Sequence, residues 1–126
     1  MTTRTPEWSV DSIEDLNGTV IAITGANSGI GFEAAKVLAA KGATIVMGCR
    51  NRQKGEAART ALAAASPSGT IELLDLDMAD LRSVRSFAAN LSEIAPNLDV
   101  LVNNAGIMAV PYDTTADGFE LSLIHI

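Results

Sequence analysis

The stretch Val20-Ile21-Ala22-Ile23-Thr24-Gly25-Ala26-Asn27-Ser28-Gly29-Ile30-Gly31 decides the fold of this chain. Its first four residues form an apolar run that predicts a buried strand, and a helix-like pattern follows the last glycine. Glycines in such a turn permit tight bends and let a ligand approach the backbone where a Cβ would block it. The first helical turn then offers unpaired N–H groups and the positive end of its dipole. Strand, turn and helix together predict a site for the diphosphate of a dinucleotide.

The rest of the chain continues to alternate strand and helix patterns. We expect strands at about 19–24, 43–48, 71–76 and 98–102, and helices at about 28–41, at about 52–65 behind an Asn51 cap, and from Asp80 to just before Pro96. This alternation predicts an α/β fold, a Rossmann-like doubly wound parallel sheet with right-handed crossovers. The strands are expected in the order 3-2-1-4, with a ligand crevice between the first and fourth, where the winding reverses.

The ends of the chain are expected to differ from the domain at 18–120. Residues 1–17 are polar and irregular and predict an arm laid on the domain, with Trp8 and Ile13 as possible anchors. Residues 121–126 predict a tail. Within the first helix, one apolar face is expected to carry Ile30, Ala34, Val37 and Leu38.

Composition limits the class of protein. The chain has 126 residues, enough for one domain, and is 48% hydrophobic but only 4% aromatic, which favours an Ala/Val/Leu/Ile core of helices packed closely on a parallel sheet. A net charge of −6 argues against a general nucleic-acid or acidic-membrane partner. Cys49 is the sole cysteine, so it predicts a buried apolar residue and no thiol metal site. With no signal peptide or membrane span in the sequence, a cytoplasmic location is expected.

Arg50 follows the second expected strand, at the point that faces the adenosine ribose in this architecture. An acidic residue there would accept a hydrogen bond from a free 2′-hydroxyl, whereas Arg suits a 2′-phosphate. Gly48-Cys49-Arg50-Asn51 contains no acid, so the sequence favours NADP(H) over NAD(H). The alternative is a solvated Arg at a helix start.

Two further groups stand at strand ends. Asp77, just after the third strand and followed by Met78, could accept a hydrogen bond from the adenine amino group; Asp75 is the competing candidate, and a turn or helix cap is the alternative role. Asn103-Asn104-Ala105-Gly106 closes the fourth strand, where small residues let a cofactor pass and an Asn can tie strand ends together. We expect the structural role for Asn103.

Thr24-Gly25-x-x-x-Gly29-x-Gly31 with Asn103-Asn104-Ala105-Gly106 resembles the short-chain dehydrogenase/reductase family, over about 17–120. The glycine loop, Cys49-Arg50-Asn51, Ile107-Met108 and residues 115–120 look most like its retinol-dehydrogenase-like branch, whose members commonly use NADP(H). The resemblance implies an oxidoreductase that moves a hydride between nicotinamide and an alcohol or carbonyl carbon. It also implies an apolar small-molecule substrate and a homo-oligomer for the full-length form.

The cofactor site predicted from these arguments combines the loop, the strand ends and the closing segment. Its members are Gly25, Asn27, Ser28, Gly29, Ile30, Gly31, Arg50, Asn51, Asp77, Met78, Asn104, Ala105 and Gly106.

No catalytic residue can be carried over from the family. Its proton donor is the Tyr of a Tyr-x-x-x-Lys motif, whereas Tyr112 is the only tyrosine and Ala116 stands four residues later. The last six residues, Leu121-Ser122-Leu123-Ile124-His125-Ile126, depart from the family pattern. We therefore expect a truncated cofactor-binding portion that is inactive alone; a non-catalytic binding module or a non-functional fragment are the alternatives.

Overall fold

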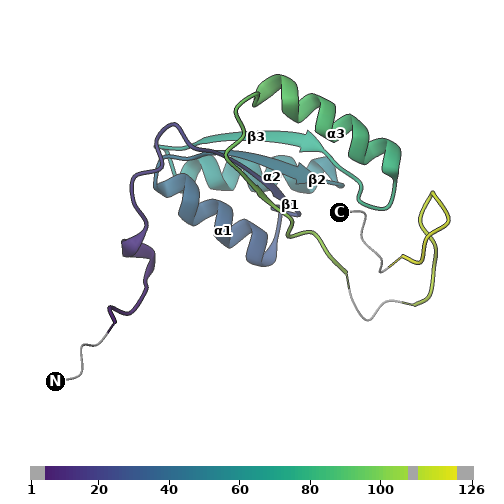
Figure 1. Ribbon diagram of the computed structural model, residues 1–126, viewed down its shortest axis with the longest axis horizontal. Helices are drawn as coiled ribbons and strands as arrows, with labels where there is room; N and C mark the ends of the chain where they lie inside the picture. Colours follow the sequence, from purple (N-terminus) through teal and green to yellow (C-terminus); the bar gives the residue numbers. More distant parts are fainter. Residues whose placement is uncertain (1–4, 108–110, 122–126) are drawn as a thin grey trace.

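Four parallel strands form the centre of the computed structural model, which describes residues 5–107 and 111–121 (Figure 1). They are β1 (Val20–Thr24), β2 (Thr44–Cys49), β3 (Thr70–Asp75) and β4 (Val100–Val102). The sheet order is β3-β2-β1-β4, which confirms the expected order. Because every pairing is parallel, all four carboxyl ends lie at one edge of the sheet.

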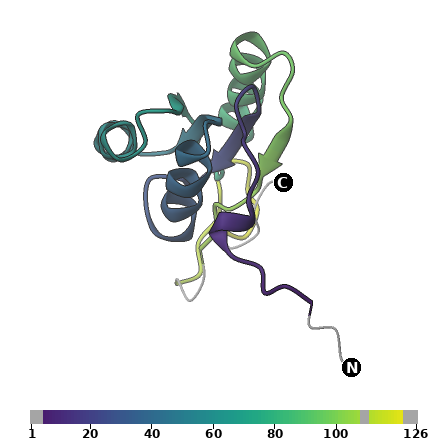
Figure 2. The ribbon, with the colours of Figure 1, turned by 90° about the vertical axis from the view of Figure 1, so that its left-hand side faces the viewer.

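Three helices cover the two faces of this sheet. α1 (Gly29–Ala40) and α2 (Arg52–Ala65) lie on one face, and α3 (Leu81–Ile94) lies on the other (Figures 1 and 2). The caps expected for α2 and α3 are confirmed. The Asn51 side chain accepts a hydrogen bond from Lys54 N, and the Asp80 side chain accepts one from Arg82 N. Such caps satisfy backbone donors that a helix leaves unpaired at its start.

The core is split by the sheet into two apolar clusters. Ile21 and Ile23 of β1 face the cluster under α1 and α2, while Ala22 between them faces the cluster under α3. This alternation follows from the two-residue period of a strand. Both faces of β1 are therefore buried, which explains its uninterrupted apolar sequence.

The face of α1 that packs on the sheet agrees with the predicted one at Leu38, which contacts the α1/α2 cluster, but not at Ile30. Ile30 is 84% exposed, and the buried residues of the helix are Gly31, Ala35 and Ala39. These three follow one another at intervals of four residues, so they share a face. Their small size lets the helix approach the sheet closely.

Of the two anchors expected for the N-terminal arm, Ile13 is partly buried and Trp8 is exposed. A short 3₁₀ helix (Val10–Ser12) interrupts it, and Trp8 is 71% exposed, so Trp8 as an anchor was wrong. Leu16 packs against the α1/α2 cluster, and its N–H donates to Lys41 O over 2.9 Å. The expected tail, apart from Leu121, lies outside the described residues, as does Met108.

No helix in the ranges 5–107 and 111–121 combines the length and the apolar character that crossing a bilayer requires.

β4 forms an exposed edge of the sheet. Within the described ranges it pairs only with β1, and Val100 and Leu101 are 43% and 48% exposed. An apolar strand with unpaired backbone groups is a template for pairing with another chain.

We predict that the chain self-associates through this edge and that Leu101→Lys reduces the association, because an edge lysine opposes strand pairing. Sedimentation velocity over a concentration series measures it. Ile94→Lys is the matched control, since Ile94 is 49% exposed but lies on α3. A sharp monomer for the unchanged chain at every concentration would contradict the prediction.

Candidate functional site

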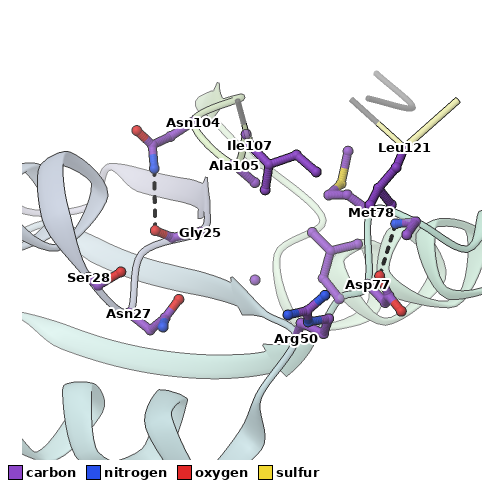
Figure 3. Close-up of a pocket in the computed structure, with 14 residues that line it drawn as sticks. Gly25, Asn27, Ser28, Arg50, Asp77, Met78, Asn104, Ala105, Ile107 and Leu121 are labelled. Atoms are coloured by element: carbon purple, nitrogen blue, oxygen red, sulfur yellow. Dashed lines mark hydrogen bonds between the residues drawn. The ribbon is translucent and has the colours of Figure 1, made fainter. Parts of the chain in front are cut away.

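A cavity of about 360 Å³ lies at the carboxyl ends of the strands (Figure 3). Each strand contributes to its lining through the segment that follows it, and the chain near 121 adds one more residue. The lining residues are Gly25, Asn27, Ser28, Gly48, Arg50, Leu76, Asp77, Met78, Ala79, Asn104, Ala105, Gly106, Ile107 and Leu121. Both its place at the point where strand order reverses and its size fit a small-molecule site.

Thr24 and Asn104 join the ends of β1 and β4 beside this cavity. The Thr24 hydroxyl, 4% exposed, accepts hydrogen bonds of 3.0 Å from the N–H groups of Asn104 and Ala105. Asn104 Nδ2 in turn donates to Thr24 O at 3.1 Å and Gly25 O at 3.3 Å (Figure 3 shows the latter). We call this set of bonds the Thr24–Asn104 link.

The link corrects the role expected for the Asn pair. Asn103 is exposed, and it is Asn104 that ties the strand ends. The sequence did not lead us to expect that Thr24 joins the two strand ends. Its signal was a hydroxyl at the end of an otherwise apolar strand, which must find partners if it is buried.

Two glycines of the loop are required by close packing around the link. A Cβ on Gly25 would lie 3.0 Å from Ala105 Cα, and Gly25 has φ +67°. A Cβ on Gly31 would lie 2.5 Å from Asn104 Nδ2 and 2.6 Å from Gly25 O. The loop, α1 and the chain after β4 therefore approach one another at distances that only glycine permits.

Gly29 differs from these two because it faces open space. Its φ is +59°, yet a Cβ there would have no neighbour within 4 Å. The Ser28 side chain makes no cap hydrogen bond. In the part of the chain that the structure describes, the N–H groups of Gly29, Ile30 and Gly31 have no acceptor. The positive end of the helix is thus available to an anion, as a phosphate site requires.

Cys49 lies beneath the same loop. It is 2% exposed, and burial raises the pKa of its thiol, an effect that the backbone N–H groups of Ala26 and Asn27 partly offset. The expectation of a buried residue is confirmed. A thiol in this state is neutral at physiological pH and unreactive.

Arg50 is the cation available at the rim of the cavity. It is exposed and lines the cavity, and it has no ion-pair partner among residues 5–107 and 111–121. Arg52, by contrast, is paired with Asp75 at 3.1 Å and with Glu56 at 3.5 Å. Among the described residues, Arg52 is therefore already paired with carboxylates, whereas Arg50 is not.

Asp77, and not Asp75, lines the cavity. One carboxylate oxygen of Asp77 accepts a hydrogen bond from Ala79 N at 2.9 Å, and Asp77 N donates to Ser83 Oγ at 2.8 Å. Asp77 thus shapes the turn before α3. It combines a turn role with a position on the cavity wall (Figure 3).

The predicted site residues divide into three groups. The structure brings Gly25, Asn27, Ser28, Arg50, Asp77, Met78, Asn104, Ala105 and Gly106 together around the cavity. Gly29, Ile30 and Gly31 lie in the adjoining first turn of α1, while Asn51 caps α2. The cavity is also lined by five residues outside the predicted set: Gly48, Leu76, Ala79, Ile107 and Leu121. Gly48 alone carried a signal, as a glycine at a strand end.

No group of three or more His, Cys, Asp or Glu side chains suited to a metal ion occurs in the described part of the chain.

Comparison with known proteins agrees with this geometry. Residues 19–122 match the short chain dehydrogenase family, so the chain belongs to that family. It is 44% identical over 108 residues to retinol dehydrogenase 11 of Mus musculus and 43% identical over 108 residues to retinol dehydrogenase 12 of Homo sapiens, covering 86% of this chain and 34% of each relative. The resemblance to the retinol-dehydrogenase-like branch is thereby confirmed.

A solved structure is similarly close. An uncharacterised protein from Mycobacterium paratuberculosis is 46% identical, with a TM-score of 0.80, and the match covers 91% of this chain and 40% of that one. The chain thus spans about a third of the length of the curated relatives that it matches.

We predict that Gly31→Ala destabilises the protein by about 3 kcal/mol, because the new Cβ would overlap Gly25 O and push Asn104 out of the link. Gly29→Ala should cost only about 1 kcal/mol, the strain of a left-handed backbone at a site with free space. Urea unfolding measures both. Equal losses of unfolding free energy in the two variants would contradict the prediction, because they would show that the close packing at Gly31 adds nothing to the stability of the protein.

Proposed function

We propose that the chain is the cofactor-binding portion of an NADP(H)-dependent short-chain oxidoreductase. The observation that carries the proposal is a pair of free donor groups among the described residues. The N–H groups at the start of α1 have no acceptor, and Arg50, which lines the adjoining cavity, has no ion-pair partner. Such a cavity fits a dinucleotide: the diphosphate at the helix start and the adenosine ribose toward Arg50. When bound, the nicotinamide half supplies or accepts the hydride.

The free cation is the argument for a 2′-phosphate. Arg52 is held by two carboxylates, whereas Arg50 lines the cavity without one. No acidic side chain stands at the end of β2 to accept a bond from a 2′-hydroxyl. A planar guanidinium matches the phosphate oxygens in charge and geometry.

The proposal gives roles to the other members of the predicted site as well. Asp77 and Met78 form the wall toward the adenine, and Asn104, Ala105 and Gly106 form the wall toward the nicotinamide, after β4. Ile107 and Leu121 add apolar surface, which favours an apolar alcohol or carbonyl substrate. We also propose that the full-length form is a homo-oligomer.

The sequence contains no Tyr-x-x-x-Lys motif. Tyr112 is 80% exposed and has Ala116 in place of the motif lysine. A non-catalytic NAD(P)-binding module is therefore the second candidate for this chain. Incubating the purified chain with NADPH and a panel of aldehydes and ketones separates the two, because only an enzyme oxidises NADPH in step with carbonyl reduction.

The loop assignment is tested by Gly29→Ala. The added methyl would occupy the open space where the diphosphate is proposed to lie, so we expect NADPH binding to weaken about tenfold, or ~1.4 kcal/mol. Gly18→Ala is the matched control: Gly18 also has positive φ (+85°) and nothing within 4 Å, but lies before β1, at the opposite end of that strand from the cavity. Isothermal titration with NADPH measures both. Equal affinities for the two variants would refute the loop assignment.

Cofactor preference is tested at Arg50. Arg50→Ala should weaken NADPH binding about tenfold, since a charged hydrogen bond contributes about 1.5 kcal/mol, and leave NADH binding unchanged. Arg50→Asp should turn the preference toward NADH. Arg59→Ala is the control and should change the NADPH/NADH ratio less than about twofold, because Arg59 lies on α2 outside the cavity lining and its exposed ion pair with Glu56 contributes little. An unaltered ratio in Arg50→Ala would place Arg50 in solvent and remove the argument for NADP(H).

A further inference from the structure

The segment from Asp113 to Leu121 folds into a small turn of its own. Thr114 and Glu120 form an antiparallel bridge, and Leu121 N donates to Asp113 O over 2.8 Å. The Thr115 hydroxyl, on a residue only 7% exposed, accepts from the N–H groups of Asp117 and Phe119. We call residues 113–121 the return segment.

Hydrogen bonds dock the return segment on the start of α3. Leu81 N donates to Asp117 Oδ2 at 2.8 Å, and Ala116 N donates to Ala79 O at 3.0 Å. Leu81 is the first residue of α3, so its N–H has no acceptor within the helix. Asp117 therefore supplies a cap from 36 residues away, in addition to the local cap from Asp80.

This docking joins two parts of the cavity wall. Ala79, which receives the bond from Ala116, lines the cavity together with Asp77 and Met78. Leu121, at the end of the return segment, lines it as well. Figure 3 shows Leu121, Met78 and Asp77 on the same side of the cavity. The position of Leu121 relative to the Asp77–Ala79 turn thus depends on the bonds made by Asp117 and Ala116.

We propose that Asp117 is a positioning residue for the adenosine half of the cofactor. By holding the return segment against the start of α3, it fixes the wall formed by Leu121 and the Asp77–Ala79 turn, against which the base packs. This inference rests on the proposed function, since it takes the adenosine to lie on the Asp77 side. Asp117 itself does not line the cavity, so it acts through the residues that it places.

Binding of 2′,5′-ADP, the adenosine fragment with its 2′-phosphate, tests the proposal by isothermal titration on the whole chain. Asp117→Ala should raise the dissociation constant of 2′,5′-ADP about fivefold. An effect of this size corresponds to the free energy that the loss of one helix cap typically costs. Asp117→Asn keeps an oxygen that can accept from Leu81 N and should restore binding to within about twofold. Asp80→Ala is the matched control, because it removes the other cap of α3, the bond from Arg82 N, without touching the return segment.

Amide hydrogen exchange without ligand gives the second readout. In Asp117→Ala the amides of Ala116 and Leu81 should exchange faster, while in Asp80→Ala the amide of Ala116 should remain protected. Equal loss of 2′,5′-ADP affinity in Asp117→Ala and Asp80→Ala would reduce Asp117 to a helix cap and overturn the proposal.

The remaining outcomes separate the two proposals. If the unchanged chain binds neither 2′,5′-ADP nor NADPH, the proposed function fails and the role of Asp117 fails with it. If it binds both, and Asp117→Ala binds 2′,5′-ADP equally well despite fast exchange at Ala116, only the positioning role is overturned.

Discussion

The buried hydroxyl of Thr24 is the constraint on which the site depends. A hydroxyl that is 4% exposed must have hydrogen-bond partners, and here it takes them from the backbone at Asn104 and Ala105. These hydrogen bonds hold the end of β1 next to the end of β4. With those ends fixed, the loop after β1 and the chain after β4 approach closely, and the space left for Cβ atoms at Gly25 and Gly31 disappears.

The same contact couples the site to the folding of the whole sheet. Thr24 and Asn104 are 80 residues apart in the chain, and β4 adds to the sheet only through β1. The cavity wall after β4 therefore exists only when the long-range pairing of β1 with β4 has formed. A ligand that binds across the two strand ends would stabilise this pairing, since binding to the folded state alone shifts the folding equilibrium.

The alternation of apolar runs with helical patterns was sufficient to predict the sheet order, and strand ends were sufficient to place Arg50 and Asp77 at the cavity, because parallel strands bring their carboxyl ends to one edge. Three details depended on packing that no periodicity encodes. Asn104 makes the link, and not Asn103, because the backbone after β4 turns the Asn104 side chain toward Thr24 and Gly25. The fully buried positions of α1 are the small residues Gly31, Ala35 and Ala39, whereas Ile30 is exposed. The docking of Asp117 on Leu81 joins residues with no shared pattern.

The net charge of −6 opposes the binding of an anionic dinucleotide on average, but charges in salt solution act over a short range. The Debye length at physiological ionic strength is about 8 Å, so most of the acidic surface is screened from the cavity. The groups that the loop and the end of β2 offer are donors: the N–H groups at the start of α1 and the Arg50 guanidinium. Asp77, on the cavity wall, accepts a hydrogen bond from Ala79 N, and Asp75, at the end of β3, is paired with Arg52. That ion pair removes one negative charge from the neighbourhood of Arg50 and leaves Arg50 as the cation at the rim, so the local field favours a phosphate although the protein as a whole is acidic.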